Sequence, residues 1–413
     1  MDIKRLTHAV FLILIFLNTS IYAQSPGTDA DIAKYRKGII KIKTKPGSNV
    51  MIEQQSHEFW FGCAISNGFV NGTMKESDRK AYEENFLKNF NSAVTENAVK
   101  WGNMESRQSE VNYKVVDSIL AWTERHHIPL RAHNVFWGIE KFVQPWLKEM
   151  NDSILRVTLE QRAQTLASHY KGRFIEYDLN NEMVHGNYYE QRLGPLITYD
   201  MAKWMHQGDP SARLFLNDYD ILTGAKLPEY MTQVRTLLQQ GVPIAGIGVQ
   251  GHLHTDTFDR YQLKRALDSL AIFGLPIRIT EFNMPGQRSK YLREKILTMT
   301  PEEEALKAHE LVDYYKICFA HPAVTGMVMW GFWAGANWIP TSSLYRQDWT
   351  ATPAADAYHK LIYEDWWTKT MIKADKKGWV TVPAFYGRYK VSAGSKTREV
   401  FLTKKSGGVE VKF

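Results

Sequence analysis

The sequence predicts an α/β fold, a (β/α)8 TIM barrel, with a small β-rich unit formed by the N- and C-terminal flanks. Strand-like apolar segments and helical segments alternate eight times between residues 59 and 365. No glycine-rich phosphate-binding loop follows the first strand-like segment, which disfavours the alternative of an open doubly wound sheet. Both flanks show the period-two alternation of half-buried strands.

Each unit of the barrel is predicted from a short apolar run followed by a segment with helical periodicity. Strands are expected at residues 59–65, 91–95, 129–133, 174–181, 212–217, 244–250, 276–280 and 324–330. Helices are expected at residues 76–90, 111–126, 154–170, 196–207, 226–240, 259–272, 301–320 and 352–364. This alternation is typical of βαβ units and a parallel sheet.

The flanks predict a separate β unit. Residues 35–53 alternate in polarity around a Pro-Gly-Ser-Asn turn, which predicts a hairpin. Further strands are expected at residues 379–382, 389–391 and 399–403. The expected division is an N-terminal β segment at 24–58, a catalytic domain at 59–365 and a C-terminal β segment at 366–413. We expect the two flanks to pack together and support the barrel, and sugar binding by this unit is the alternative.

The first residues predict a signal peptide. A short basic segment precedes an apolar core at residues 9–17, and the Ile-Tyr-Ala sequence at 21–23 provides a cleavage site before Gln24. The core is too short to span a bilayer comfortably, and no other stretch is long and apolar enough. We therefore expect residues 1–23 to be removed and the chain to be secreted, either to the periplasm or to the extracellular space.

Composition limits the remaining function classes. The net charge is +7, and residues 366–413 hold eleven Lys or Arg against three Asp or Glu. This basic segment either contacts an acidic polysaccharide or anionic cell surface, or is simply a solvated extension. Nothing resembles a nucleic-acid-binding module. Cys63 and Cys318 either pair or remain two buried thiols, and no Cys/His spacing predicts a metal site.

Two glutamates stand where predicted strands end. Glu182 closes the run that contains the fourth strand, and Glu281 closes the run that contains the seventh. The carboxyl ends of barrel strands meet at one mouth, which is where barrel enzymes carry their chemistry. Hydrolysis of a glycosidic bond uses a pair of carboxyl groups, so the pair predicts a glycosidase site. Other polar residues follow strands two, three and six: Glu96, Asn97, His133 and His252.

Eight ordered motifs in residues 36–365 resemble glycoside hydrolase family 10, the endo-1,4-β-xylanase family. Asp-Leu-Asn-Asn-Glu at 178–182 is similar to the acid/base motif, and Ile-Thr-Glu-Phe-Asn at 279–283 to the nucleophile motif. The segments that resemble the sugar-binding motifs are 96–101, 131–137 and 246–252, together with Trp330 and Trp338. The order of the motifs makes the resemblance specific, since each one alone is weak.

The resemblance implies a retaining, endo-acting hydrolysis of xylan that needs no metal or organic cofactor. Glu281 would be the nucleophile and Glu182 the acid/base, about 5–5.5 Å apart. Burial and the charge of Glu281 are expected to raise the pKa of Glu182. Asn181 would bind the sugar 2-hydroxyl, and His252 would orient Glu281 with Gln250 nearby. The remaining expected substrate-binding residues are Glu96, Asn97, Lys100, His133, Trp137, Trp330 and Trp338, and the role of Trp333 stays open.

The sequence also departs from the family pattern. Asn283 stands where the nucleophile motif usually has aspartate, and Gly138 stands where a histidine usually follows the tryptophan. The loop at residues 331–340 differs from the commonest form. These departures leave two alternatives open: a glycosidase for another β-glycan or for xylo-oligosaccharides, and a catalytically weak carbohydrate-binding protein. Oligomeric state is not predicted.

Overall fold

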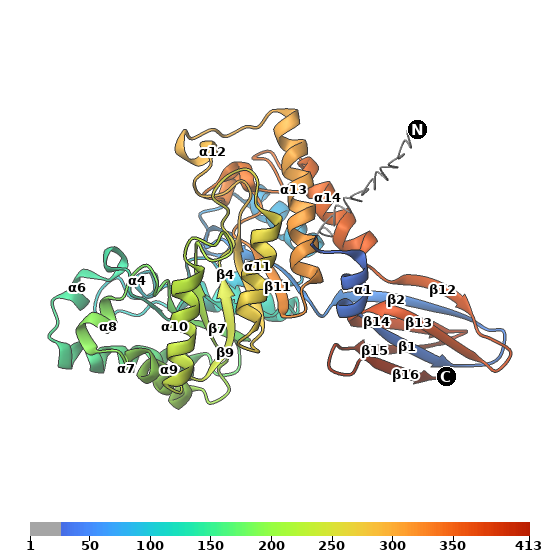
Figure 1. The fold of residues 1–413 in the computed structure, drawn as a ribbon, viewed down its shortest axis with the longest axis horizontal. Helices are drawn as coiled ribbons and strands as arrows, with labels where there is room; N and C mark the ends of the chain where they lie inside the picture. Colours follow the sequence, from blue (N-terminus) through green and yellow to red (C-terminus); the bar gives the residue numbers. More distant parts are fainter. Residues whose placement is uncertain (1–25) are drawn as a thin grey trace, which may run out of the picture.

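The computed structural model describes residues 26–413, so the predicted signal peptide at 1–23 lies outside the described residues. In this part of the chain, eight parallel strands form a closed barrel (Figure 1), because β11 pairs with β3 and β5 pairs with β7. The strands are β3 (Trp60–Ile65), β4 (Ser92–Thr95), β5 (Leu130–Ala132), β7 (Glu176–Asn181), β8 (Leu214–Asp218), β9 (Ile244–Val249), β10 (Ile277–Phe282) and β11 (Val324–Met329). The short β6 (Phe136–Trp137) adds to β7.

Helices connect successive barrel strands. The large ones are α3 (Glu76–Asn89), α5 (Lys114–Arg125), α7 (Asp152–His169), α9 (Ile197–Gly208), α10 (Leu227–Gln239), α11 (Arg260–Ala271), α13 (Pro301–Ala320) and α14 (Pro353–Lys360). Shorter helices are α2 (Gly68–Asn71), α4 (Trp101–Met104), α6 (Pro145–Lys148), α8 (Tyr188–Leu193) and α12 (Lys290–Arg293). The (β/α)8 prediction is confirmed, and every predicted strand and helix corresponds to one of these elements.

Local sequence explains where the longest helix begins. Thr300 precedes α13 and accepts a hydrogen bond from the backbone of Glu303, whose side chain accepts one from the backbone of Thr300. This reciprocal capping box satisfies two backbone donors that a helix start leaves without partners. Pro301 occupies the first helical position, where no backbone N–H is needed. The result is a well-defined start for α13, which packs against β11.

The two flanks form a β-sandwich beside the barrel (Figure 1). One sheet has the order β13-β1-β16 and the other β12-β2-β14-β15. The N-terminal strands are β1 (Lys37–Lys43) and β2 (Asn49–His57), and the C-terminal strands are β12 (Lys369–Lys373), β13 (Trp379–Phe385), β14 (Gly387–Ala393), β15 (Lys396–Leu402) and β16 (Gly408–Lys412). The predicted β-rich unit from both flanks is thereby confirmed.

The predicted hairpin at residues 35–53 is wrong. β1 and β2 lie in different sheets and pack face to face, with Ile40 and Ile42 of one strand and Val50 and Ile52 of the other in a single apolar core. Period-two alternation specifies that one face of a strand is buried, but it does not specify the strand's hydrogen-bonding partner. Both strands find their partners in the C-terminal flank instead.

The sandwich lies at the amino ends of the barrel strands. A cavity of about 230 Å³ separates the two units and is lined by residues that start barrel strands, such as Trp60 and Thr325, together with His57, Tyr386 and Lys404. The short helix α1 (Asp29–Arg36) bridges the units, because Arg36 donates to the carbonyls of His321 and Val324 at 2.6 and 2.8 Å. The sandwich is therefore at the opposite end of the barrel from the carboxyl ends of its strands.

Charged side chains fill the lower interior of the barrel. Arg131 of β5 donates to Glu176 at 2.6 Å and also to Asp178, and Arg278 of β10 donates twice to Glu176, at 3.1 Å each. All four side chains are buried. Buried charges are tolerated when they are paired and hydrogen-bonded, and this network fixes the relative position of three strands.

The remaining sequence predictions concern cysteines and membranes. Cys63 and Cys318 are both buried free thiols, so the unpaired alternative holds. None of the helices between residues 26 and 413 is long and apolar enough to cross a membrane.

Candidate active site

Irregularities at two strand ends direct the key side chains into the barrel mouth. The register between β7 and β8 shifts between Asp178 and Asn181, and the register of β10 against β11 shifts between Ile279 and Phe282. A local bulge re-aims the side chains that follow it. Asn181 and Glu281 consequently both lie within hydrogen-bond reach of Asn217, at the end of β8.

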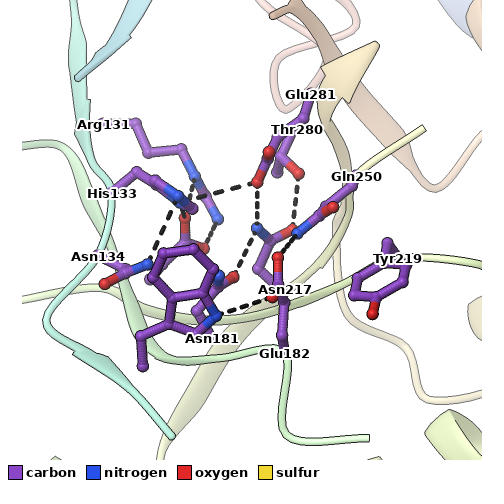
Figure 2. Close-up of polar contacts among 12 residues, drawn as sticks. Arg131, His133, Asn134, Asn181, Glu182, Asn217, Tyr219, Gln250, Thr280 and Glu281 are labelled. Atoms are coloured by element: carbon purple, nitrogen blue, oxygen red, sulfur yellow. Dashed lines mark hydrogen bonds and ion pairs between the residues drawn. The ribbon is translucent and has the colours of Figure 1, made fainter. Parts of the chain in front are cut away.

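Asn217 joins the two sides of the site (Figure 2). Its amide nitrogen donates to Asn181 Oδ1 at 3.0 Å and to Glu281 Oε1 at 2.9 Å. Its amide oxygen accepts from the Thr280 hydroxyl at 2.6 Å, which fixes the orientation of the amide. Asn181 is fully buried, and its own amide nitrogen has no hydrogen-bond partner within residues 26–413. A buried donor without a partner is costly, so this atom is available to a ligand hydroxyl.

The surroundings of Glu182 favour its protonated, neutral form. Its two oxygens accept from Trp137 Nε1 and Gln250 Nε2, each at 2.7 Å. Burial raises its pKa above the ordinary value, and the charge of Glu281 adds to the rise, against the opposing effect of these two bonds. The backbone of Glu182 adopts a φ of 58°, a left-handed conformation that non-glycine residues rarely take. Such strain is concentrated at functional sites.

Glu281 is held in the opposite charge state. Burial opposes its ionisation, but electrostatic attraction to His133, a hydrogen bond with His252 and the charge of Lys100 lower its pKa to about 2. His252 Nε2 lies 3.2 Å from Glu281 Oε2, and His133 Nδ1 lies 3.8 Å from Oε1. His133 is oriented in turn by Asp178, at 2.8 Å. The mouth thus shifts the pKa values of its two carboxyl groups in opposite directions.

Residues after β4 line one side of this mouth. Lys100 Nζ donates to Asn97 Oδ1 at 2.8 Å and lies 4.8 Å from the centre of the Trp137 ring. Glu96 is largely buried, and burial raises its pKa despite the nearby Lys100. A cavity of about 130 Å³ adjoins them, lined by Lys100, Trp101, Gly102, Asn103, Asn134, Trp137, Phe142, Gln144 and Tyr189. The cavity provides a polar and aromatic recess beside Glu182.

The predicted tryptophans have different environments. Trp330 is buried with its ring edge-to-face against His133, at 5.0 Å between centroids. Trp338 is 44% exposed and donates from Nε1 to Asn283 at 2.9 Å. The unassigned Trp333 stacks on Trp349 at 4.4 Å in the hydrophobic core, so it is a packing residue. Trp338 is therefore the tryptophan of this loop that presents an open face to the cleft.

The departures from the family pattern fit their surroundings. The Asn283 amide donates to the Trp330 carbonyl at 3.2 Å and to the Ser342 hydroxyl at 2.9 Å. A carboxylate at this position could not donate to that carbonyl. At Gly138, a Cβ atom would lie 3.3 Å from the carbonyl of Gly186, so a histidine there would crowd the turn that follows Glu182.

Sequence reasoning missed the residues that end β8. Asn217 was described above, and Asp218 accepts from His185 Nδ1 at 2.7 Å and from the Val184 backbone at 2.8 Å, which holds the turn after Glu182. His185 also stacks on Tyr219 at 3.6 Å. The signal was present, because Asn217-Asp218 follows a predicted strand as Glu182 and Glu281 do.

The barrel mouth brings together Glu182, Glu281 and the predicted binding residues. Polar contacts join the ends of β7, β8, β9 and β10 to the segments that follow β4 and β5. Within residues 26–413, no cluster of three or more His, Cys, Asp or Glu side chains has the arrangement of a metal site.

The chain matches the sequence model of a known protein family. Residues 51–364 match the model described as Glycosyl hydrolase family 10. Endo-1,4-beta-xylanase 1 of Arabidopsis thaliana is 33% identical over 373 residues, and Anti-sigma-I factor RsgI6 of Acetivibrio thermocellus is 32% identical over 373 residues. The alignments cover 88% and 87% of this chain, but only 37% and 45% of those relatives, so the chain spans less than half of their length.

Solved structures share the barrel. The crystal structure of xylanase 10B from Thermotoga petrophila RKU-1 in complex with xylobiose superposes with a TM-score of 0.66 at 24% identity. The superposition covers 75% of this chain and 95% of that one.

Proposed function

This chain belongs to glycosyl hydrolase family 10, and from that membership we propose that it hydrolyses internal β-1,4-xylosidic bonds of xylan with retention of configuration. The observation that carries the proposal is that the site shifts the pKa values of Glu182 and Glu281 in opposite directions. Burial and the Glu281 charge raise the pKa of Glu182, whereas the cationic and hydrogen-bonding neighbours of Glu281 lower its pKa to about 2. One group is a proton donor and the other a nucleophile over the same pH range.

In the first step, a Glu281 oxygen attacks the anomeric carbon while Glu182 donates its proton to the glycosidic oxygen that leaves. Asn217 and His252 hold the attacking carboxylate in place through its two oxygens. The free amide hydrogens of Asn181 are available to the 2-hydroxyl, a contact that strengthens as the anomeric carbon becomes positive.

In the second step, the loss of the negative charge on Glu281 changes the protonation of Glu182. Once Glu281 is esterified it is no longer negative, so a cause of the raised Glu182 pKa is removed and Glu182 ionises. The carboxylate then takes a proton from water as that water attacks the anomeric carbon and releases Glu281. Trp137 and Gln250 donate to both oxygens of Glu182, which favours its ionised form in this step.

Xylan is the proposed substrate because several relatives are named endo-1,4-beta-xylanases. Another relative is named an anti-sigma factor rather than a xylanase. The rival function is sugar binding without turnover. The differential charging of Glu182 and Glu281 favours hydrolysis, since sugar binding alone requires no proton donor facing a carboxylate.

The test is a comparison of substrates. The purified chain is incubated with xylan, cellulose and mixed-linkage glucan, and products are resolved by size over time. We expect a ladder of short oligosaccharides from xylan alone, and no turnover for the Glu281→Ala variant. Binding of xylan without release of any product would overturn the proposal, and products from another glucan would reassign the substrate.

We also propose that the chain is exported, on the support of the basic and apolar segments in residues 1–23. N-terminal sequencing of the protein recovered outside the cytoplasm should begin at Gln24. Recovery of a chain that still begins at Met1 would contradict this proposal.

A further inference from the structure

The sandwich carries an excess of positive charge, whereas the rest of the chain carries a slight excess of negative charge. Residues 37–57 and 366–413, which build its strands and turns, hold fifteen Lys or Arg and four Asp or Glu. The rest of the chain holds 36 Lys or Arg and 40 Asp or Glu. Catalysis at the far end of the barrel does not account for this separation of charge, and a stable fold does not require it, since like charges repel.

Four of these basic residues share the outer face of the sheet β13-β1-β16, which we call the lysine face. Because side chains alternate along β1, Lys37, Lys41 and Lys43 project from this face while Ile40 and Ile42 point into the core. Lys412 of β16 lies opposite Lys43 in the strand register and joins the same face. One carboxylate lies among them, Glu410, which forms an ion pair with Lys412 at 3.1 Å.

Apolar groups lie between these lysines. Trp379 of β13 is in register with Lys43, whose ammonium lies 5.1 Å from the ring centre, and Pro383 is in register with the partly exposed Ile39. Aromatic and aliphatic surfaces stack on the apolar faces of sugar rings, while ammonium groups pair with carboxylates. The lysine face therefore offers both kinds of contact in alternating positions.

The opposite face of the sandwich is less suited to an anion. There the basic residues Lys369, Lys373, Arg388 and Lys390 share the face with Glu53 and Glu399, which lie in register opposite Lys369 and Lys390. Lys369 forms an ion pair with Glu53 at 3.2 Å. This face provides a matched control, because its strands present the same number of basic residues but two carboxylates instead of one.

We infer that the lysine face binds a polysaccharide that carries carboxylate groups, such as a xylan with uronic acid side groups. The inference extends the proposed function, because a barrel that cleaves a glycan gains from a second contact with the same material. The two sites lie at opposite ends of the barrel, so the lysine face acts as an anchor to the matrix rather than as an extension of the cleft. Linked binding of this kind raises the effective concentration of substrate at the mouth.

Binding to defined polymers tests this inference. The full chain carrying Glu281→Ala, which prevents cleavage, is titrated with glucuronic-acid-substituted xylan and with the same polymer after its carboxyl groups are reduced to alcohols. We expect the acidic polymer to bind at least about tenfold more tightly at low salt, with the difference lost as the salt concentration rises. Equal binding of both polymers at all salt concentrations overturns the inference.

Paired variants assign the binding to a face. Lys41→Ser/Lys412→Ser removes two charges from the lysine face, and Lys373→Ser/Lys390→Ser removes two from the opposite face. All four side chains are exposed, so neither pair disturbs the core. We expect the first pair to abolish most of the preference for the acidic polymer and the second to leave it within about threefold of the parent.

Three outcomes would overturn the assignment. An equal loss of the preference for the acidic polymer in both double variants shows diffuse attraction rather than a binding site. No loss in either pair places the binding elsewhere. Binding to phosphatidylserine vesicles that matches the acidic polymer in strength, and is lost in the first pair, identifies a membrane surface as the ligand instead. None of these measurements requires turnover, so they are independent of the proposed hydrolysis.

Discussion

Asn217 is the single residue on which both halves of the site depend. It donates to the carboxylate of Glu281 and to the amide of Asn181, so it aligns the nucleophile with the group available to the sugar 2-hydroxyl. Neither charge nor motif marks it, and its importance follows from its position at the end of β8 between the two bulged strands.

Replacement of Asn217 by alanine should lower kcat/KM about 10- to 100-fold, because a hydrogen bond to an ionised group contributes about 1.5–3 kcal/mol. The substitution also removes a donor that favours the charged form of Glu281, so the pKa of Glu281 should rise. The acidic limb of the pH profile should therefore shift from near pH 2 to higher pH. Steady-state kinetics between pH 2 and 7 measure both effects. An unchanged acidic limb, with normal thermal unfolding, would contradict this role for Asn217.

The role of Glu182 is tested by how the reaction rate of a variant depends on the leaving group of the substrate. Glu182→Ala should lower the rate on xylan about 10²- to 10⁴-fold, the usual contribution of a general acid. With aryl xylosides that have good leaving groups, the rate of the first step should fall far less, since these leaving groups depart without protonation. In the parent enzyme activity should fall as pH rises through the elevated pKa of Glu182, and this basic limb should vanish in the variant. A basic limb that persists would assign it to another group.

The sequence predicted the two carboxylates and placed His252 beside Glu281, but it did not predict Asn217 or the bond from Trp137 to Glu182. Glu182 and Glu281 were found because apolar strands end at them, a pattern visible in any parallel barrel. The choice of Asn181 over Asn180 as the inward residue depends on a bulge in β7, which alternation alone does not reveal. Trp137 was expected to stack on sugar, whereas its indole N–H is bonded to Glu182. Such side-chain bonds depend on tertiary positions that no local pattern encodes.

At the level of elements, the strands of the barrel are tied together by charge as well as by backbone hydrogen bonds. Arg131 links β5 to β7, and Arg278 links β7 to β10 through Glu176. Asp178 belongs to this network and also bonds His133, so the network supports the orientation of the residues around Glu281.

Removal of one partner should therefore be strongly destabilising. We expect Arg131→Met to cost about 3–5 kcal/mol of unfolding free energy, because it leaves Glu176 and Asp178 buried with reduced compensation. Denaturant unfolding followed by tryptophan fluorescence measures the loss. A matched substitution of the exposed Arg173, which pairs with Glu124 on the surface at 2.7 Å, should cost less than about 1 kcal/mol. Equal costs for the two variants would show that the buried network is not a stabilising feature.

Helices and barrel strands were predicted more successfully than the flanks, for a physical reason. In a βαβ unit each element packs against its neighbours in the sequence, so order along the chain specifies most contacts. The sandwich strands instead pair across the whole chain: Lys37–Lys43 with Trp379–Phe385, and Asn49–His57 with Lys369–Lys373. The alternation in residues 35–53 was read correctly as strand, and only the partner was wrong.

For the molecule as a whole, the position of the sandwich predicts that a substitution in its core lowers stability without changing catalysis. Ile42 is fully buried in the sandwich core, far from the mouth. Ile42→Ala should destabilise that core by about 2–5 kcal/mol and leave kcat on short soluble xylo-oligosaccharides unchanged. Calorimetry and kinetics on the same sample provide the two readings. A large fall in kcat below the unfolding transition would show that the two units are coupled.

The pairing of both flanks in one sandwich also determines the order of events during synthesis. A ribosome releases β1 and β2 before any of the barrel, and their partners β12 to β16 only after it. At about 5–20 residues per second the first two strands wait on the order of tens of seconds with apolar faces uncovered. The barrel is, in this sense, an insertion between two strands of a β-domain that becomes complete only when the last residues emerge. Unpaired strands of this kind invite edge-to-edge association, so slowed elongation should lower the yield of soluble protein.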